Sequence, residues 1–201
     1  MQTWQDPRYG EFIDLNKDSD MKRLMLCVSV ATALAAAAAT AGPIADSVAQ
    51  TKVPLTTCMD LVAEQIGAAI GHVEFESRKG DPTYEFTVNA KGATYYVGCS
   101  GNTGLISAVD LIVNSDDPRW AAAAKITEEE AKGAATARYA GSVEEVKRLL
   151  LQSGQAVYEV DIEIPDGNGE FNVYVNAADG AIVQVNLEYW EIPESVPGDL
   201  D

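Results

Sequence analysis

The chain of 201 residues is 47% hydrophobic and 22% charged, so it is long and apolar enough to bury one or two cores, which excludes a disordered polymer. Its 31 acidic residues exceed its 14 basic residues and give a formal net charge of −17. This charge excludes nucleic acid and anionic lipid as expected partners, because both would be repelled at long range. A cationic partner or divalent ions fit better, although an acidic surface that only maintains solubility is the simpler interpretation.

The chain begins with an acidic stretch, residues 1–20, that precedes a predicted export signal at residues 21–41. A secretory signal normally starts at the N-terminus, so we expect residues 1–20 to be a misassigned or disordered extension and translation to start at Met21. The signal consists of a basic pair, an apolar run rich in alanine, and a small-x-small site that permits cleavage between Ala41 and Gly42. A second such site leaves the mature start anywhere from Gly42 to Gln50.

A transmembrane anchor is the competing interpretation of this apolar run. It is the weaker one, because alanine is only weakly hydrophobic and the run ends in small residues rather than in an aromatic or basic stop. The sequence therefore predicts a periplasmic or secreted protein of the bacterial envelope, with no stable membrane insertion after signal cleavage.

The three cysteines fit this location. Cys27 lies inside the predicted signal, which leaves Cys58 and Cys99 as an even pair in an oxidising compartment. We expect these two to form a disulfide, and the alternative is a pair of free buried thiols. A bridge closing a loop of about 40 residues would contribute about 4 kcal/mol by the chain-entropy estimate.

Residues 51–113 are predicted to fold into a helix followed by antiparallel strands. Thr56 or Thr57 begins a helix with apolar residues at helical spacing, and Gly71 ends it. Strands with alternating apolar residues follow at 84–88 and 95–99, so Cys58 in the first helical turn and Cys99 in an inward strand position would join the helix to the sheet. A short polar linker, residues 114–118, ends this part of the chain.

Residues 119–189 repeat the same order. Thr127 and Glu130 form a capping box that begins a helix, which extends to Tyr139 and is followed by Gly141 as its expected C-cap. Residues 143–151 fit a helix or a strand, and we favour a strand. From residue 156 the period changes to two, with acidic residues on the face opposite the apolar one. The predicted fold class is α+β, with two tandem small domains, each a helix packed on a three- to four-stranded antiparallel sheet. Residues 190–201 are predicted to be an acidic disordered tail.

Three segments of the second half resemble a PepSY domain: the capped helix start Ile126 to Ala131, the strand Tyr158-Glu159-Val160, and the turn from Val173 to Val183. The first half is similar only in outline and is interpreted as a divergent first copy of the same domain. PepSY domains occur in propeptides of secreted metallopeptidases and as free-standing envelope proteins, and they are thought to restrain peptidases. The resemblance implies a non-enzymatic protein with no catalytic residues and no cofactor.

The residues themselves also give no catalytic set. His72 is the only histidine and lacks the partners of a zinc site or a general base, so it is interpreted as a surface residue. Asp166, Asn168 and Glu170 surround a Gly-rich turn and are weak candidates for a calcium site. A solvated hairpin is the simpler interpretation, and the predicted set of metal ligands is therefore none.

Exposed sheet edges are the remaining candidate for function. An extended peptide could add to an edge through backbone hydrogen bonds, or the two units could use up their edges by pairing with each other. The sequence therefore predicts an exported protein that binds a protein partner, with a secreted or envelope peptidase as the expected target. The alternative is an envelope protein that binds a small ligand or a divalent cation with its acidic faces. The oligomeric state is left open.

Overall fold

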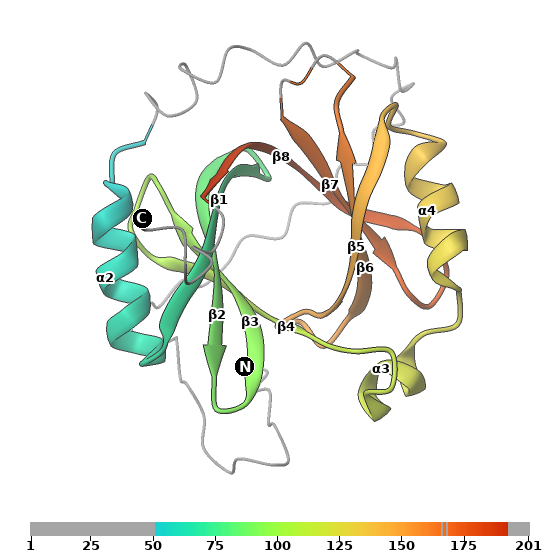
Figure 1. The fold of residues 1–201 in the computed structure, drawn as a ribbon, viewed down its shortest axis with the longest axis horizontal. Coiled ribbons are helices and arrows are strands. Elements are labelled where there is room, and N and C mark those ends of the chain that lie inside the picture. The colour runs from blue at the N-terminus through green and yellow to red at the C-terminus, as the bar shows by residue number, and fades with distance from the viewer. Residues whose placement is uncertain (1–50, 166, 168, 193–201) are drawn as a thin grey trace, which may run out of the picture. The chain divides into compact units, whose positions relative to one another are not determined.

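The computed structural model describes residues 51–165, 167 and 169–192 (Figure 1). Several predictions fall outside these residues: the extension 1–20, the signal 21–41 with cleavage between Ala41 and Gly42, the calcium candidates Asp166 and Asn168, and residues 193–201 of the predicted tail. Residues 190–192, predicted as the start of that disordered tail, instead belong to the last strand.

Eight antiparallel strands form one sheet that closes into a barrel, with each strand beside the next in the sequence and the last beside the first (Figure 1). The strands are β1 (Ala69–Arg78), β2 (Asp81–Ala90), β3 (Ala93–Ser100), β4 (Ile106–Ile112), β5 (Ser142–Leu150), β6 (Ala156–Glu163), β7 (Glu170–Asn176) and β8 (Ile182–Ile192). The helices are α2 (Leu55–Ile66), α3 (Pro118–Ala123) and α4 (Glu128–Thr136). The order of one helix and four strands therefore occurs twice along the chain.

The prediction of two separate domains is wrong, because both halves contribute to a single sheet. Six residues of β1 pair with β8, from Val73 with Ile192 to Arg78 with Asn186. On the other side, β4 joins β5 through only two pairs, Leu111 with Leu150 and Ile112 with Leu149. Each half alone would expose two strand edges, and their pairing satisfies backbone groups that would otherwise need water.

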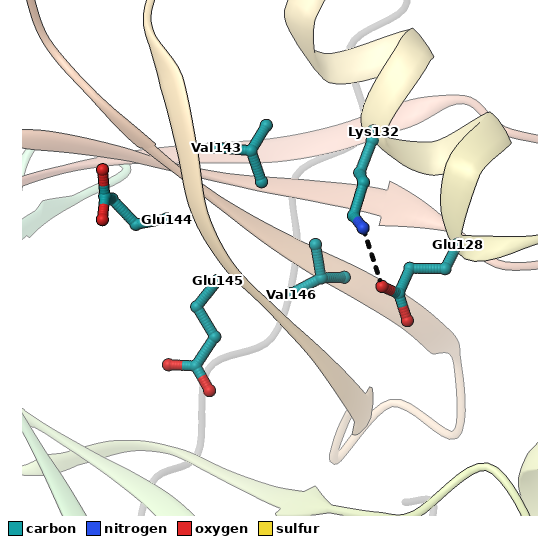
Figure 2. Close-up of a pocket in the computed structure, with 6 residues that line it drawn as sticks. All are labelled: Glu128, Lys132, Val143, Glu144, Glu145 and Val146. Atoms are coloured by element: carbon teal, nitrogen blue, oxygen red, sulfur yellow. Dashed lines mark ion pairs between the residues drawn. The ribbon is translucent and has the colours of Figure 1, made fainter.

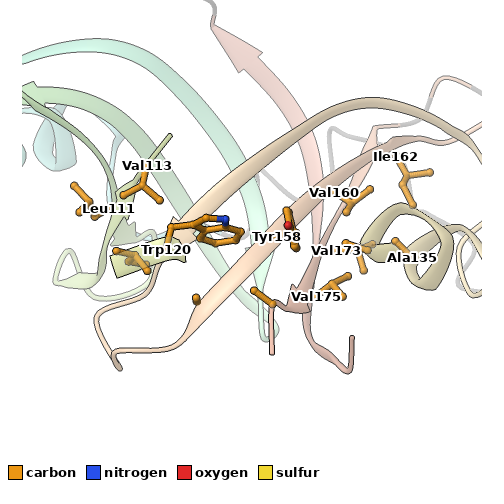
Figure 3. Packing of buried hydrophobic residues seen from close by; sticks show 13 residues of the cluster. Leu111, Val113, Trp120, Ala135, Tyr158, Val160, Ile162, Val173 and Val175 are labelled. Carbon is orange, nitrogen blue, oxygen red and sulfur yellow. The ribbon is translucent and has the colours of Figure 1, made fainter. Parts of the chain in front are cut away.

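Two hydrophobic cores lie between the outer face of the sheet and the helices. One contains α2 against β1, β2 and β3, and the other contains α3 and α4 against the second half. In the second core, Trp120 of α3 packs edge-on against Tyr158, with ring centroids 4.8 Å apart (Figure 3). Ala131 and Ala135 of α4 are completely buried. Their small side chains let the helix approach the sheet closely.

The capping box of α4 is confirmed: the Glu130 amide donates to the Thr127 hydroxyl at 3.2 Å, and the Thr127 amide donates to the Glu130 carboxylate at 2.7 Å. The predicted end of this helix is wrong, because α4 ends at Thr136 with Ala137 as its C-cap, before Tyr139 and Gly141. The prediction for α2 is wrong at both ends. Pro54 occupies the N-cap position, and Gly67, not Gly71, ends the helix with φ of 68°. Glycine favours this left-handed conformation because it lacks a Cβ. Gly71 instead lies within β1.

The predicted disulfide is confirmed. Cys58 in the first turn of α2 is bonded to Cys99 of β3, and both residues are completely buried in the first core. Residues 142–150 form strand β5, as favoured from the sequence, because they pair with β6 along their whole length. Within the described part of the chain, no helix is both long enough and apolar enough to span a lipid bilayer.

Candidate functional site

The inner face of the barrel carries buried acidic side chains beside a small hydrophobic cluster of Tyr96, Leu149, Val157 and Tyr174. Because side chains alternate along a strand, the residues between the outward apolar positions point inward. We call the seven buried carboxylates of this face the acidic interior: Glu74, Glu76, Glu85, Asp110, Glu159, Asp161 and Glu188, each at most 7% exposed. The sequence placed acidic residues on the face of this strand opposite the apolar one, and the structure shows that Glu159 and Asp161 on that face are buried.

Two basic side chains accompany these acids. The Arg78 guanidinium donates to Glu85 at 2.6 Å and to Asp110 at 2.9 Å. The Lys147 ammonium donates to Asp161 at 2.9 Å and lies 4.0 Å from Glu74. With all groups ionised, seven carboxylates and two cations leave an excess of five negative charges. Charges removed from water are stable only when paired, so this excess requires protons or other cations.

The strand register brings like charges directly opposite each other. Glu74 of β1 faces Glu85 of β2, and Glu76 of β1 faces Glu188 of β8. The second contact continues into a chain of four acids, because Glu188 also faces Glu170, and Glu170 faces Glu163. We call Glu163, Glu170, Glu188 and Glu76 the glutamate row. Directly opposed like charges destabilise a sheet, and here such pairs recur along the inner face of the barrel.

The pKa values of these carboxyl groups are raised. Burial is the largest cause that raises the pKa of Glu76 well above its usual range, and the charge of Glu85 raises this pKa further. The pKa of Glu159 is also well above its usual range, first because the group is buried and second because Asp161 lies nearby. Burial raises the pKa of Glu188 to about 7, and Glu170 adds to the shift. Several carboxyl groups of the acidic interior are therefore expected to hold protons at neutral pH.

Neutral polar groups in the same place also lack partners. The hydroxyl of Tyr174 and the side-chain carbonyl of Asn172, each in a residue 1% exposed, have no hydrogen-bond partner among the described residues. Tyr174 lies opposite Glu159 and lowers its pKa, but their geometry does not complete a hydrogen bond. Buried polar atoms normally have partners, so these two groups require an explanation.

The sequence-predicted site residues are only partly brought together. Glu170 lies in the glutamate row, half-buried, whereas Asp166 and Asn168 are outside the described residues. Among the residues that are described, no three His, Cys, Asp or Glu side chains already converge on one metal position. His72 lies at the rim of the barrel, with its Nε2 atom 3.0 Å from the Glu191 carboxylate.

A second feature is a pocket of about 370 Å³ between α4 and β5, which we call the α4–β5 pocket (Figure 2). Its lining is Glu128, Lys132, Val143, Glu144, Glu145 and Val146. Figure 2 shows the two valines on the side of β5 that faces α4, and Glu144 and Glu145 on its other side. The Lys132 ammonium is 2.9 Å from Glu128, so the only cation in this lining is already paired.

The pocket adjoins a strand edge. β5 pairs with β6 along its whole length, but its opposite edge meets β4 only at Leu149 and Leu150. Among the described residues, no strand pairs with that edge from Ser142 to Lys147. Such a segment presents backbone N–H and C=O groups that an extended peptide can bind.

Comparison with known proteins identifies the second half of the chain. The family model "PepSY: Peptidase propeptide and YPEB domain" matches residues 125–186, and this segment is a PepSY domain. The match spans α4, β5, β6, β7 and the first five residues of β8 (Ile182–Ile192), and a divergent copy in the first half stays a prediction.

No curated protein matches the chain. A crystal structure of a protein provisionally described as a lipoprotein, from Clostridium difficile 630, is similar over 68% of this chain and 93% of its own, with 17% identity and a TM-score of 0.30. A likeness at this score carries no argument about fold or function.

Sequence reasoning missed both the acidic interior and the α4–β5 pocket. One signal for the acidic interior was present: acidic residues alternate with apolar ones in Glu74 to Glu76 as they do in Glu159 to Asp161. The pocket depends on how far β4 and β5 pair, which no local pattern specifies.

Proposed function

We propose that this chain is an exported, non-enzymatic binding protein that restrains a secreted or envelope peptidase. The observation that carries the proposal is the PepSY domain at residues 125–186, whose family description names a peptidase propeptide. A propeptide acts by binding its peptidase, and the family brings no catalytic residues to this chain. Export is supported by the predicted signal and by the disulfide between Cys58 and Cys99, since disulfides persist in oxidising compartments.

The docking surface we assign to the peptidase is the open edge of β5 with the α4–β5 pocket. A strand of the partner aligned with Ser142 to Lys147 would take up the free backbone groups of the edge. Alternate side chains of that strand would contact Val143 and Val146, both half-buried, on the side facing α4. Backbone pairing would supply affinity, and the pocket would select the side chain it accepts.

The charge of this surface favours a cationic partner segment. Glu144 and Glu145 are exposed on one side of the edge, and on the other side Lys132 is within 3.0 Å of Glu129 and so adds no free positive charge. Complementary charge accelerates encounter more than it increases affinity, so it should affect the association rate and its salt dependence.

The test measures peptidase activity in the native secreted fraction with increasing amounts of the purified protein. We expect a concentration-dependent loss of activity that is weakened by Glu144→Lys with Glu145→Lys. The matched control is Asp60→Lys with Glu64→Lys, two exposed acids of α2 that change the net charge equally. The proposal fails if no peptidase activity is lost, and the docking surface is wrong if both double variants inhibit equally.

The variant Asp166→Asn with Glu170→Gln distinguishes this function from the alternative of ligand or cation binding by the acidic faces. Both substitutions leave the β5 edge intact, so inhibition should be retained. Inhibition that depends on the hairpin would instead place the partner there.

A further inference from the structure

The direction of the backbone groups on the open edge of β5 follows from the join with β4. The Val113 amide, just after β4, donates to the Arg148 carbonyl at 2.9 Å. Backbone groups alternate between the two sides of a strand, and β5 pairs with β6 without interruption from Glu145 to Leu150, so the N–H and C=O of Val146 also point to the β4 side. No described strand pairs with Val146 there. Val146 is therefore the residue that would exchange backbone hydrogen bonds with an added strand.

The two faces of β5 differ at this position. Val146 lies on the face toward α4 and packs against the second core (Figure 2). Its neighbours Glu145 and Lys147 lie on the other face, with the Lys147 ammonium 3.4 Å from the Glu145 carboxylate and 2.9 Å from that of Asp161. Residues directly opposite each other in an antiparallel pair share a face. An added strand would therefore place one side chain beside Val146, in the α4–β5 pocket, and the side chains before and after it beside Lys147 and Glu145.

Each of these three positions favours a different kind of side chain. Beside Val146 an apolar side chain fits, because the pocket of about 370 Å³ presents Val143 and Val146 there. Beside Glu145 a basic side chain fits, because the Glu145 side chain is 62% exposed and opposite charges that face each other stabilise a pair of strands. Beside Lys147 a basic side chain is disfavoured, because two like charges would then face each other. The edge therefore distinguishes the two neighbours of the apolar residue.

The direction of the added strand turns this difference into a sequence preference. β5 is antiparallel to both β4 and β6, and a strand that continues the line of β4 has the direction of β4. Its residues then meet Lys147, Val146 and Glu145 in that order. We propose that the open edge of β5 selects partner segments in which an apolar residue is followed directly by lysine or arginine. This inference rests on the docking surface of the proposed function and names the sequence that this surface prefers.

The experiment measures the binding of two labelled peptides of identical composition, Ser-Ser-Leu-Arg-Ser-Ser and Ser-Ser-Arg-Leu-Ser-Ser, to the folded, oxidised protein by fluorescence anisotropy. We expect the leucine–arginine order to bind about fivefold more tightly, because the reverse order places arginine opposite Lys147 and serine opposite Glu145. In Glu145→Lys the preference should move to Ser-Ser-Leu-Glu-Ser-Ser. Glu64→Lys, on the exposed face of α2, changes the net charge equally and should keep the preference of the parent protein.

Three outcomes overturn the inference: binding of neither peptide to the parent protein, equal binding of the two orders, and a preference for arginine that persists in Glu145→Lys. Peptide binding and peptidase inhibition are measured separately, so their failures can be told apart. A preference for the leucine–arginine order without any loss of peptidase activity supports the inference and removes the peptidase as the partner. Loss of peptidase activity without a preference between the orders retains the proposed function and overturns the inference.

Discussion

Glu76 of β1 and Glu188 of β8 lie directly opposite each other at the join where the first and last strands close the barrel. Glu76 is completely buried and Glu188 is 7% exposed, so water does not screen their repulsion. Closure of the barrel and ionisation of these two carboxyl groups therefore oppose each other.

Stability should fall as the pH rises. The folded-state pKa values of Glu76, Glu159 and Glu188 are raised by burial, so the folded protein binds more protons than the unfolded chain above the ordinary glutamate pKa. The slope of unfolding free energy against pH is then negative, from about pH 4.5 through the folded pKa of Glu188 at about 7 and beyond. Denaturant unfolding with a chelator present measures this slope. Stability that increases from about pH 5 to about pH 8 would contradict it.

Glu159→Gln should stabilise the protein at mildly alkaline pH in the absence of divalent ions. Lys147 lies opposite Glu159 but retains Asp161, while Asp161, Glu85 and Tyr174 surround the Glu159 carboxylate. Glutamine resembles the protonated acid, so it removes the cost of ionising a buried group, with an expected gain above about 1 kcal/mol. The gain should vanish at acidic pH, where the parent is protonated. Glu64→Gln on α2, exposed to solvent, should show no such pH-dependent gain.

Local patterns predicted much of the second half, because its capping residues and its period of two specify α4 and β6 without reference to the rest of the chain. They could not predict the barrel. Whether the acidic face of β6 meets water or β1 depends on the pairing of strands more than 100 residues apart, such as Arg78 with Asn186. The error at Gly71 has a local cause: Gly67 and Gly71 both follow the apolar run, and only the conformation shows that Gly67 is the cap.

Removal of the disulfide should destabilise the first half most. Cys58 and Cys99 are 41 residues apart, and the loss of their loop constraint costs about 4 kcal/mol by the chain-entropy estimate. The double variant Cys58→Ser with Cys99→Ser is compared with the parent by denaturant unfolding. A reducing agent should lower the stability of the parent and leave that of the double variant unchanged. Equal sensitivity of both proteins would show that the reductant acts elsewhere.

Two glycine substitutions should have opposite effects on stability. Gly169 precedes β7 with φ of +107°, and a Cβ there would lie 2.1 Å from the carbonyl oxygen of Glu188. Gly169→Ala must therefore displace β8 near the glutamate row and should cost at least about 1–3 kcal/mol, the usual range for a strained backbone residue.

Gly133 is the matched control, because it is exposed within α4 and a Cβ there meets nothing within 4 Å. Gly133→Ala should stabilise the protein by up to about 1 kcal/mol through helix propensity. Thermal and denaturant unfolding of both variants gives the comparison. If Gly169→Ala were as stable as Gly133→Ala, the backbone of residue 169 could not lie against β8, and the register that places Glu170 opposite Glu188 would be wrong.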